Sequence, residues 1–95
     1  MATYLIIYDV KKEATAYHAG DRKITDAIRS ISDVYWNHLD STYIIVSALS
    51  ASRIRDKLAA HLGPDDRVLL VKVDVGNSSW KGFNPKASDW LNARA

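Results

Sequence analysis

The residue best suited to chemistry in this chain is Asp9, which follows an apolar run at positions 4–8. An ionised carboxylate at the end of an apolar strand is costly unless it is hydrated, paired or bound to a metal ion. One carboxylate makes a poor metal site. Two copies brought together by a dimer axis would suit Mg²⁺, which takes oxygen ligands and keeps several waters. The structural alternative is that Asp9 ends the strand and accepts hydrogen bonds from loop amides.

Basic residues form three groups along the chain, and each group could contact phosphate. They are Lys11, Lys12, Arg22 and Lys23, then Arg53, Arg55 and Lys57, then Lys81, Lys86 and Arg94. Arg53 and Lys57 are four residues apart and so share one face of a helix. Phosphate binding needs such cations, but a solvated surface needs them too. The sequence leaves both interpretations open for each group.

Residue types exclude several other kinds of site. The chain has no Cys, which excludes disulfides, thiolate zinc sites, iron–sulfur clusters and thiol nucleophiles. Its three His residues are far apart in sequence, so a helical zinc pair is not expected. Its four Gly form neither a P-loop nor a dinucleotide-binding loop.

Periodicity and turn signals predict the elements that position these residues. Residues 3–10 are β-branched and aromatic and predict a strand. Asp21 is expected to cap a helix that runs to about Ser32 and has one apolar stripe. The remaining elements expected from the same signals are strands at 34–39, 42–48 and 66–75, and helices at 51–62 and 85–92.

The order β-α-β-β-α-β predicts an α+β fold of the ferredoxin-like kind. Right-handed crossovers then give one antiparallel sheet of spatial order 4-1-3-2, with two helices on one face. At 95 residues the chain fits one such domain. We assign residues 1–79 to this domain and residues 80–95 to an aromatic C-terminal tail that packs on the sheet or on a dimer partner.

The two strands expected at the centre of the sheet are apolar on both faces, at positions 4–8 and 42–46. A helix-free face that is covered only by water should be polar. We therefore expect a second subunit to pack on it, sheet to sheet. The interface residues expected are Tyr8, Tyr43, Trp80 and Trp90. Two alternatives for the tail are folding back over its own sheet and stacking on single-stranded bases.

Composition places the chain among ordinary globular proteins, with 47% hydrophobic and 25% charged residues. Its longest apolar run is far shorter than the ~20 residues that a membrane span needs. The N-terminus lacks the basic region and apolar core of a signal peptide. A cytoplasmic protein without a membrane partner is expected. The net charge of +2 permits nucleic-acid binding without requiring it.

Short motifs in the same order along the chain resemble the CRISPR-associated Cas-two family. Tyr8-Asp9-Val10 resembles that family's aromatic-Asp-aliphatic strand end, and Ser41-Thr42-Tyr43 resembles a Ser followed two residues later by an aromatic. The chain is similar over nearly its whole length to the SinR-like relatives, and VapD-type ribonucleases are more distant. The SinR-like features are Asp40-Ser41-Thr42, the segment Ser50 to Leu58, Asp65-Asp66, Trp80-Lys81-Gly82 and Trp90-Leu91.

The resemblance implies a ferredoxin-like homodimer that cleaves RNA or DNA, with Asp9 of each subunit as catalytic residue and ligand of Mg²⁺ or Mn²⁺. It implies a phosphate contact at Arg22, and Lys11, Lys12, Arg53 and Lys57 are the other expected nucleic-acid contacts. The same family also includes non-catalytic members that bridge proteins and contact duplex DNA. A non-catalytic adaptor or regulatory dimer is thus the alternative function, and a small-ligand regulatory domain is a third.

Overall fold

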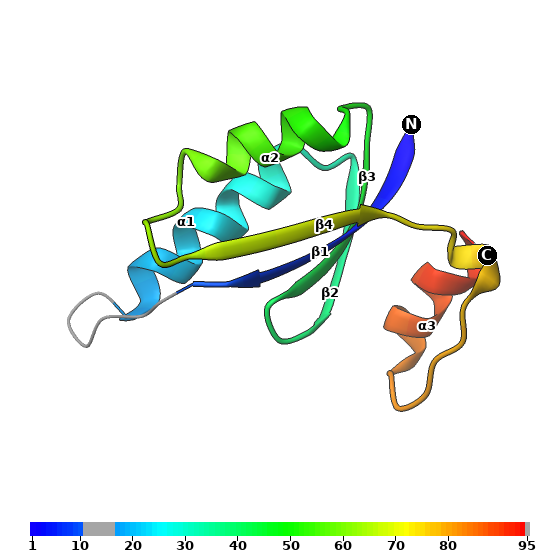
Figure 1. Ribbon diagram of the computed structural model, residues 1–95. Coiled ribbons are helices and arrows are strands. Elements are labelled where there is room, and N and C mark those ends of the chain that lie inside the picture. Colours follow the sequence, from blue (N-terminus) through cyan, green and yellow to red (C-terminus); the bar gives the residue numbers. More distant parts are fainter. Residues whose placement is uncertain (11–16, 95) are drawn as a thin grey trace.

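The computed structural model describes residues 1–10 and 17–94 (Figure 1). This part of the chain forms an α+β fold with one four-stranded sheet and three α-helices, as the sequence predicts. The elements are β1 (Ala2–Asp9), α1 (Tyr17–Ser30), β2 (Val34–Leu39), β3 (Thr42–Ser47), α2 (Ala51–Ala59), β4 (Arg67–Lys72), the 3₁₀ turn η1 (Val75–Asn77) and α3 (Pro85–Asn92).

The strands lie in the order β2-β3-β1-β4, and every neighbouring pair is antiparallel. This arrangement is compatible with a ferredoxin-like fold. β1 and β3 occupy the centre of the sheet, and β2 and β4 form its two edges. Neighbouring strands cover only the edges of β1 and β3. The side chains on their two faces must therefore be covered by helices, the tail or another molecule.

Three predicted boundaries are wrong. α2 ends at Ala59 and not at 62, and β4 ends at Lys72 and not at 75. α1 begins at Tyr17 and not after Asp21, which lies inside the helix. The apolar stripe on which the prediction rested begins at Ile24 and fixes the buried face of the helix. A first turn without apolar periodicity adds no such signal, so the pattern could not show where the helix begins.

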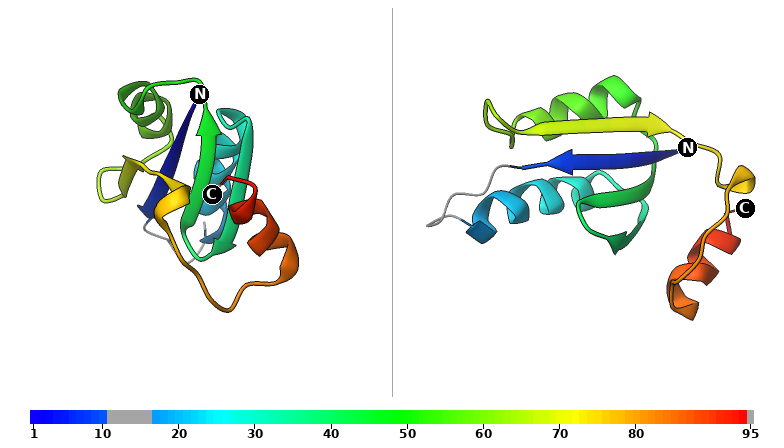
Figure 2. Two further views of the ribbon diagram at one scale, coloured as in Figure 1. Left: turned by 90° about the vertical axis from the view of Figure 1, so that its right-hand side faces the viewer. Right: turned by 60° about the horizontal axis from the view of Figure 1, so that its bottom comes forward.

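The main core lies between the sheet and the helices α1 and α2, which lie side by side over one face (Figures 1 and 2). Alternation along β1 directs its even-numbered residues toward this core. The buried residues of the main core are Tyr4, Ile6, Tyr8, Val10, Ile24, Ile28, Tyr43, Ile45, Ile54 and Leu58. The core is thus built from one face of the two central strands and the inward stripes of both helices.

The opposite face of the sheet, here called the helix-free face, is half covered by the tail. Trp36 of β2 is only 3% exposed and packs with Val75, Ala87 and Leu91 in a second core. Its indole Nε1 donates a hydrogen bond to the Ala87 carbonyl oxygen at 3.2 Å. Of the places considered for the tail, its own sheet is therefore the one that it occupies in the single chain.

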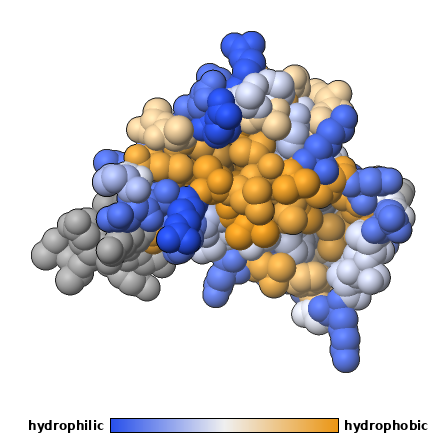
Figure 3. Space-filling model, in the orientation of Figure 1, coloured by the Kyte–Doolittle hydropathy of each residue, from blue (hydrophilic) through white to orange (hydrophobic). Residues whose placement is uncertain are grey.

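The other half of the helix-free face keeps large apolar side chains in contact with solvent. Ile7 is 43% exposed, Leu69 is 59% exposed and Val71 is 46% exposed. Register places Ile7 beside Leu69 on adjacent strands. Figure 3 shows apolar side chains gathered over the region of β4 and β1. We call Ile7, Leu69 and Val71 the exposed apolar strip.

Replacing Ile54 by Val should lower the free energy of unfolding by about 0.5–1.5 kcal/mol, because it removes a methylene from a fully buried side chain. Ile7→Val is the matched control on the other face and should cost less than about 0.5 kcal/mol. Urea unfolding followed by tryptophan fluorescence measures both values. Equal losses would contradict the assignment of the main core to the helix-covered face.

Candidate functional site

Asp9 is the last residue of β1, and its side chain is exposed. Strand alternation places it on the helix-free face together with Ile7. Its partner across the sheet is Arg67, the first residue of β4. An open polar cleft lies at this end of the sheet and is lined by Asp9, Pro64, Asp65 and Arg67. The cleft therefore joins two carboxylates and one guanidinium.

One chain supplies only some of the ligands that a divalent cation needs at this cleft. Mg²⁺ is commonly bound by one or two carboxylates with several waters, and Asp9 and Asp65 supply that number. The residues described include no group of three or more acidic or His side chains that could hold a metal. Arg67 lies opposite Asp9 in the strand register, and a guanidinium at this place suits a pair of phosphate oxygens. A second carboxylate-bearing copy would strengthen the cation site.

Arg67 is a site residue that the sequence prediction missed. A usable signal was present, since Asp65-Asp66-Arg67 directly precedes the last apolar run. In an antiparallel pair the start of one strand lies beside the end of the other. The end of β1 lies beside the start of β4 because these two strands are neighbours in the sheet. The motif alone does not show which strands are neighbours.

The other predicted nucleic-acid contacts do not all gather at the cleft. Lys11 and Lys12 lie outside the described residues. Arg22 is exposed on α1, whose first half lies at the same end of the sheet as the end of β1 (Figure 1). Arg53 and Lys57 are exposed on α2, in the helix layer. Asp9 faces the opposite side of the sheet, so Arg22, Arg53 and Lys57 do not share its face, whereas the unpredicted Arg67 does.

Tyr8 and Tyr43, expected at a subunit interface, are buried inside the single chain. Tyr8 is 7% exposed and Tyr43 is 0% exposed, and both belong to the main core. Their ring centroids lie 6.4 Å apart. The reason is alternation, which directs both side chains toward the helices. The helix-free face presents the exposed apolar strip in their place.

The Tyr43 hydroxyl accepts a hydrogen bond from Arg29 Nε at 3.2 Å, and the Arg29 guanidinium lies 5.3 Å from the centre of the Tyr35 ring. The hydrogen bond to Tyr43 raises the pKa of the Arg29 guanidinium above its ordinary value. Arg29 thus stays charged and closes the helix-side core at its edge. This cluster belongs to packing and is separate from the Asp9 cleft.

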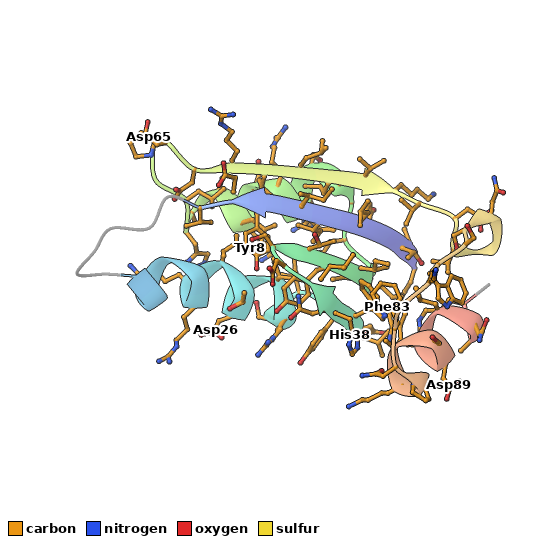
Figure 4. All side chains as sticks on the ribbon, turned by 90° about the horizontal axis from the view of Figure 1, so that it is seen from below. Tyr8, Asp26, His38, Asp65, Phe83 and Asp89 are labelled. Carbon is orange, nitrogen blue, oxygen red and sulfur yellow. The ribbon has the colours of Figure 1, made fainter. Side chains whose placement is uncertain are left out.

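Trp80 and Trp90 are half-buried and pack in the second core around Trp36. The tail leaves the sheet after β4, where the Val73 amide donates to the Thr3 carbonyl oxygen at 2.9 Å. That is the end of β1 opposite to Asp9. Figure 4 shows Asp65 and Phe83 at opposite ends of the molecule. The aromatic tail and the polar cleft are therefore two separate features.

Comparison with known proteins does not identify the site. No protein-family model matches the chain, and no curated protein matches it. The resemblance to the Cas-two family therefore stays a prediction that rests on the short motifs. Within the described residues, no helix is long and apolar enough to cross a membrane.

The tail should loosen without unfolding the domain when the cap of α3 is removed. The Asn84 side-chain oxygen accepts a hydrogen bond from the Ala87 amide at 2.8 Å, so Asn84→Ala should cost about 1 kcal/mol of helix stability. Hydrogen exchange of α3 amides should become about fivefold faster.

Ser50→Ala, which removes the matching cap of α2, is the control and should speed exchange in α2 instead. Unchanged exchange in α3 after loss of Asn84 would show that its cap does not hold this helix.

Proposed function

We propose that this chain is a ferredoxin-like, Cas-two-like homodimer that binds nucleic acid and cleaves it with Mg²⁺ or Mn²⁺ held by Asp9 from each of two copies. The observation that supports this most is the position of Asp9. It is exposed at a strand end, on the same face as the exposed apolar strip. A second copy that covers the strip would bring a second Asp9 to the same seam.

The dimer is supported by the part of the helix-free face that the tail leaves uncovered. Contiguous exposed apolar side chains in a folded domain commonly mark a protein interface. A two-fold axis places the same patch on both partners, so strip would meet strip. The interface proposed is therefore Ile7, Leu69 and Val71, without Tyr8 and Tyr43, which the helices already cover.

The residues of the cleft have separable roles in this function. Asp9 holds the cation, and a bound divalent cation supplies a water of lowered pKa and neutralises charge on the phosphate. Arg67, opposite Asp9, binds the phosphate oxygens and orients the phosphodiester. Arg22, at the same end of the molecule, contacts a neighbouring phosphate and so adds affinity that depends on salt.

A non-catalytic adaptor dimer is the second function, and the pairing of Asp9 with Arg67 favours it. A guanidinium directly opposite a carboxylate can compensate its charge without any cation. Asp9 would then be structural. The exposed Arg53 and Lys57 of α2 would contact duplex DNA or a protein partner in the helix layer.

Asp9→Asn should lower the rate of cleavage of end-labelled RNA or DNA by about 100-fold or more, because the amide is a weaker cation ligand than a carboxylate. Single- and double-stranded substrates are tested with Mn²⁺ and with Mg²⁺. Asp26→Asn, an exposed carboxylate on α1, is the matched control and should cleave like the wild type. Absent cleavage, or equal cleavage by all three proteins, would leave the adaptor as the function.

Leu69→Glu should convert the dimer to a monomer, because it buries a charge at the centre of the proposed interface. Lys72→Glu is the control on the same strand. Lys72 pairs with Tyr4, so its side chain lies on the helix-covered face, away from the proposed interface. Light scattering at micromolar concentration measures the mass of each protein. A monomeric wild type, or equal dimers in all three proteins, would contradict the proposed interface.

A further inference from the structure

A second hollow lies between the tail and the helix-free face, at the other end of the sheet from Asp9. Its volume is about 250 Å³. The residues that line it include Leu5 and Ile44 of the central strands, Trp36 and Leu39 of β2, and Trp80 and Phe83 of the tail. We call it the tail cavity. It shares no residue with the polar cleft around Asp9.

The tail cavity is apolar except for a few hydroxyl groups and one carboxylate, Asp74. Two of the hydroxyls are already used within the fold. The Thr42 hydroxyl donates to the Asp40 carbonyl oxygen at 2.9 Å, and the Ser78 hydroxyl donates to the Val75 carbonyl oxygen. Both hydroxyl protons are therefore committed, and these two side chains can meet a ligand only as hydrogen-bond acceptors.

Asp74 has one carboxylate oxygen to spare. Its Oδ1 accepts a hydrogen bond from the Gly76 amide at 3.0 Å, which caps η1 and fixes the side chain. Asp74 is exposed, and in the described part of the chain Oδ2 has no hydrogen bond to another protein group, so either water or a ligand can donate to it. A fixed negative charge beside aromatic walls calls for a ligand with an N–H donor at one edge and an otherwise apolar surface.

The size of the tail cavity sets the size of that ligand. An apolar cavity of about 150 Å³ in a protein core accommodates a benzene molecule. The tail cavity is larger by roughly the volume of a second fused ring. Trp36 and Phe83 meet edge to face with ring centroids 5.0 Å apart, so a flat ligand would pack against this aromatic pair and would not enter between the two rings.

We propose that the tail cavity binds a planar, bicyclic aromatic molecule with a ring N–H, of which indole is the simplest example, and that Asp74 Oδ2 accepts the hydrogen bond from that N–H. This site does not depend on nucleic-acid cleavage or on the cation at Asp9. It assigns a ligand-binding role to the tail, in addition to its role in covering Trp36.

Titration of the full chain with indole and with 1-methylindole, followed by the resonances of the tryptophan side-chain N–H groups, tests the proposal. Indole should shift the signals of Trp36 and Trp80. 1-Methylindole has the same ring system but no N–H donor and should bind about tenfold more weakly, because it cannot donate to the Asp74 carboxylate. Asp74→Asn keeps an oxygen for the Gly76 amide and should bring the affinity for indole close to that for 1-methylindole.

Leu39→Trp should fill the mouth of the tail cavity and abolish indole binding. Leu39 is 51% exposed, so the fold should tolerate the larger ring. Val34→Trp is the matched control, because Val34 lies on the same strand, is 38% exposed and does not line the cavity. It should keep wild-type affinity. Equal affinities for the two ligands in the wild type, or equal effects of the two Trp substitutions, would overturn the proposal.

A second copy of the chain is the rival occupant. If Leu39→Trp changes the mass measured by light scattering while the wild type shows no indole-dependent shift, the cavity is filled by self-association and the proposal is wrong. Failure of Asp9-dependent cleavage would leave this site untouched, because neither the ligands nor the variants involve the cleft.

Discussion

The structure depends on the two central strands being apolar on both faces. β1 and β3 each have a neighbour on either side, so the side chains above and below them must be shielded by other elements. α1 and α2 bury the core side chains of the two central strands on one face, whereas the tail covers only the part of the other face next to β2. The exposed strip and the tail cavity both result from this incomplete cover.

The sheet separates the polar cleft at Asp9 from the aromatic tail cavity, which lie at its opposite ends. Its antiparallel register sets Asp9 against Arg67 where β1 ends and β4 begins, and it leads the chain away after β4 toward the opposite end. The polar cleft with Asp65 therefore lies at one end and the aromatic tail with Phe83 at the other (Figure 4). A polar cleft suits phosphate or a cation, and an aromatic cavity suits a flat apolar molecule, so a single domain presents two dissimilar surfaces.

Local patterns in the sequence predicted the strands, the helices and the α+β class, because alternation and helical periodicity are local signals. They could not assign faces. Tyr8 and Ile7 are adjacent and both apolar, so the sequence alone did not show that Tyr8 meets the helices while Ile7 meets solvent. Arg67 joined the site only through the pairing of two strands almost sixty residues apart. The position of the tail depends on Trp36, because its buried indole N–H donates a hydrogen bond to the Ala87 carbonyl oxygen of α3.

The half-cover provided by the tail also has a consequence for synthesis of the chain. On the ribosome, all four strands are made before the residues that shield Trp36 and Ile44. Until α3 docks, the nascent sheet presents an apolar surface wider than that of the finished molecule, next to the unpaired edge of β2. Such surfaces recruit other chains. Docking of the tail over Trp36 and Ile44 reduces this apolar surface and so lowers the tendency of the chain to aggregate.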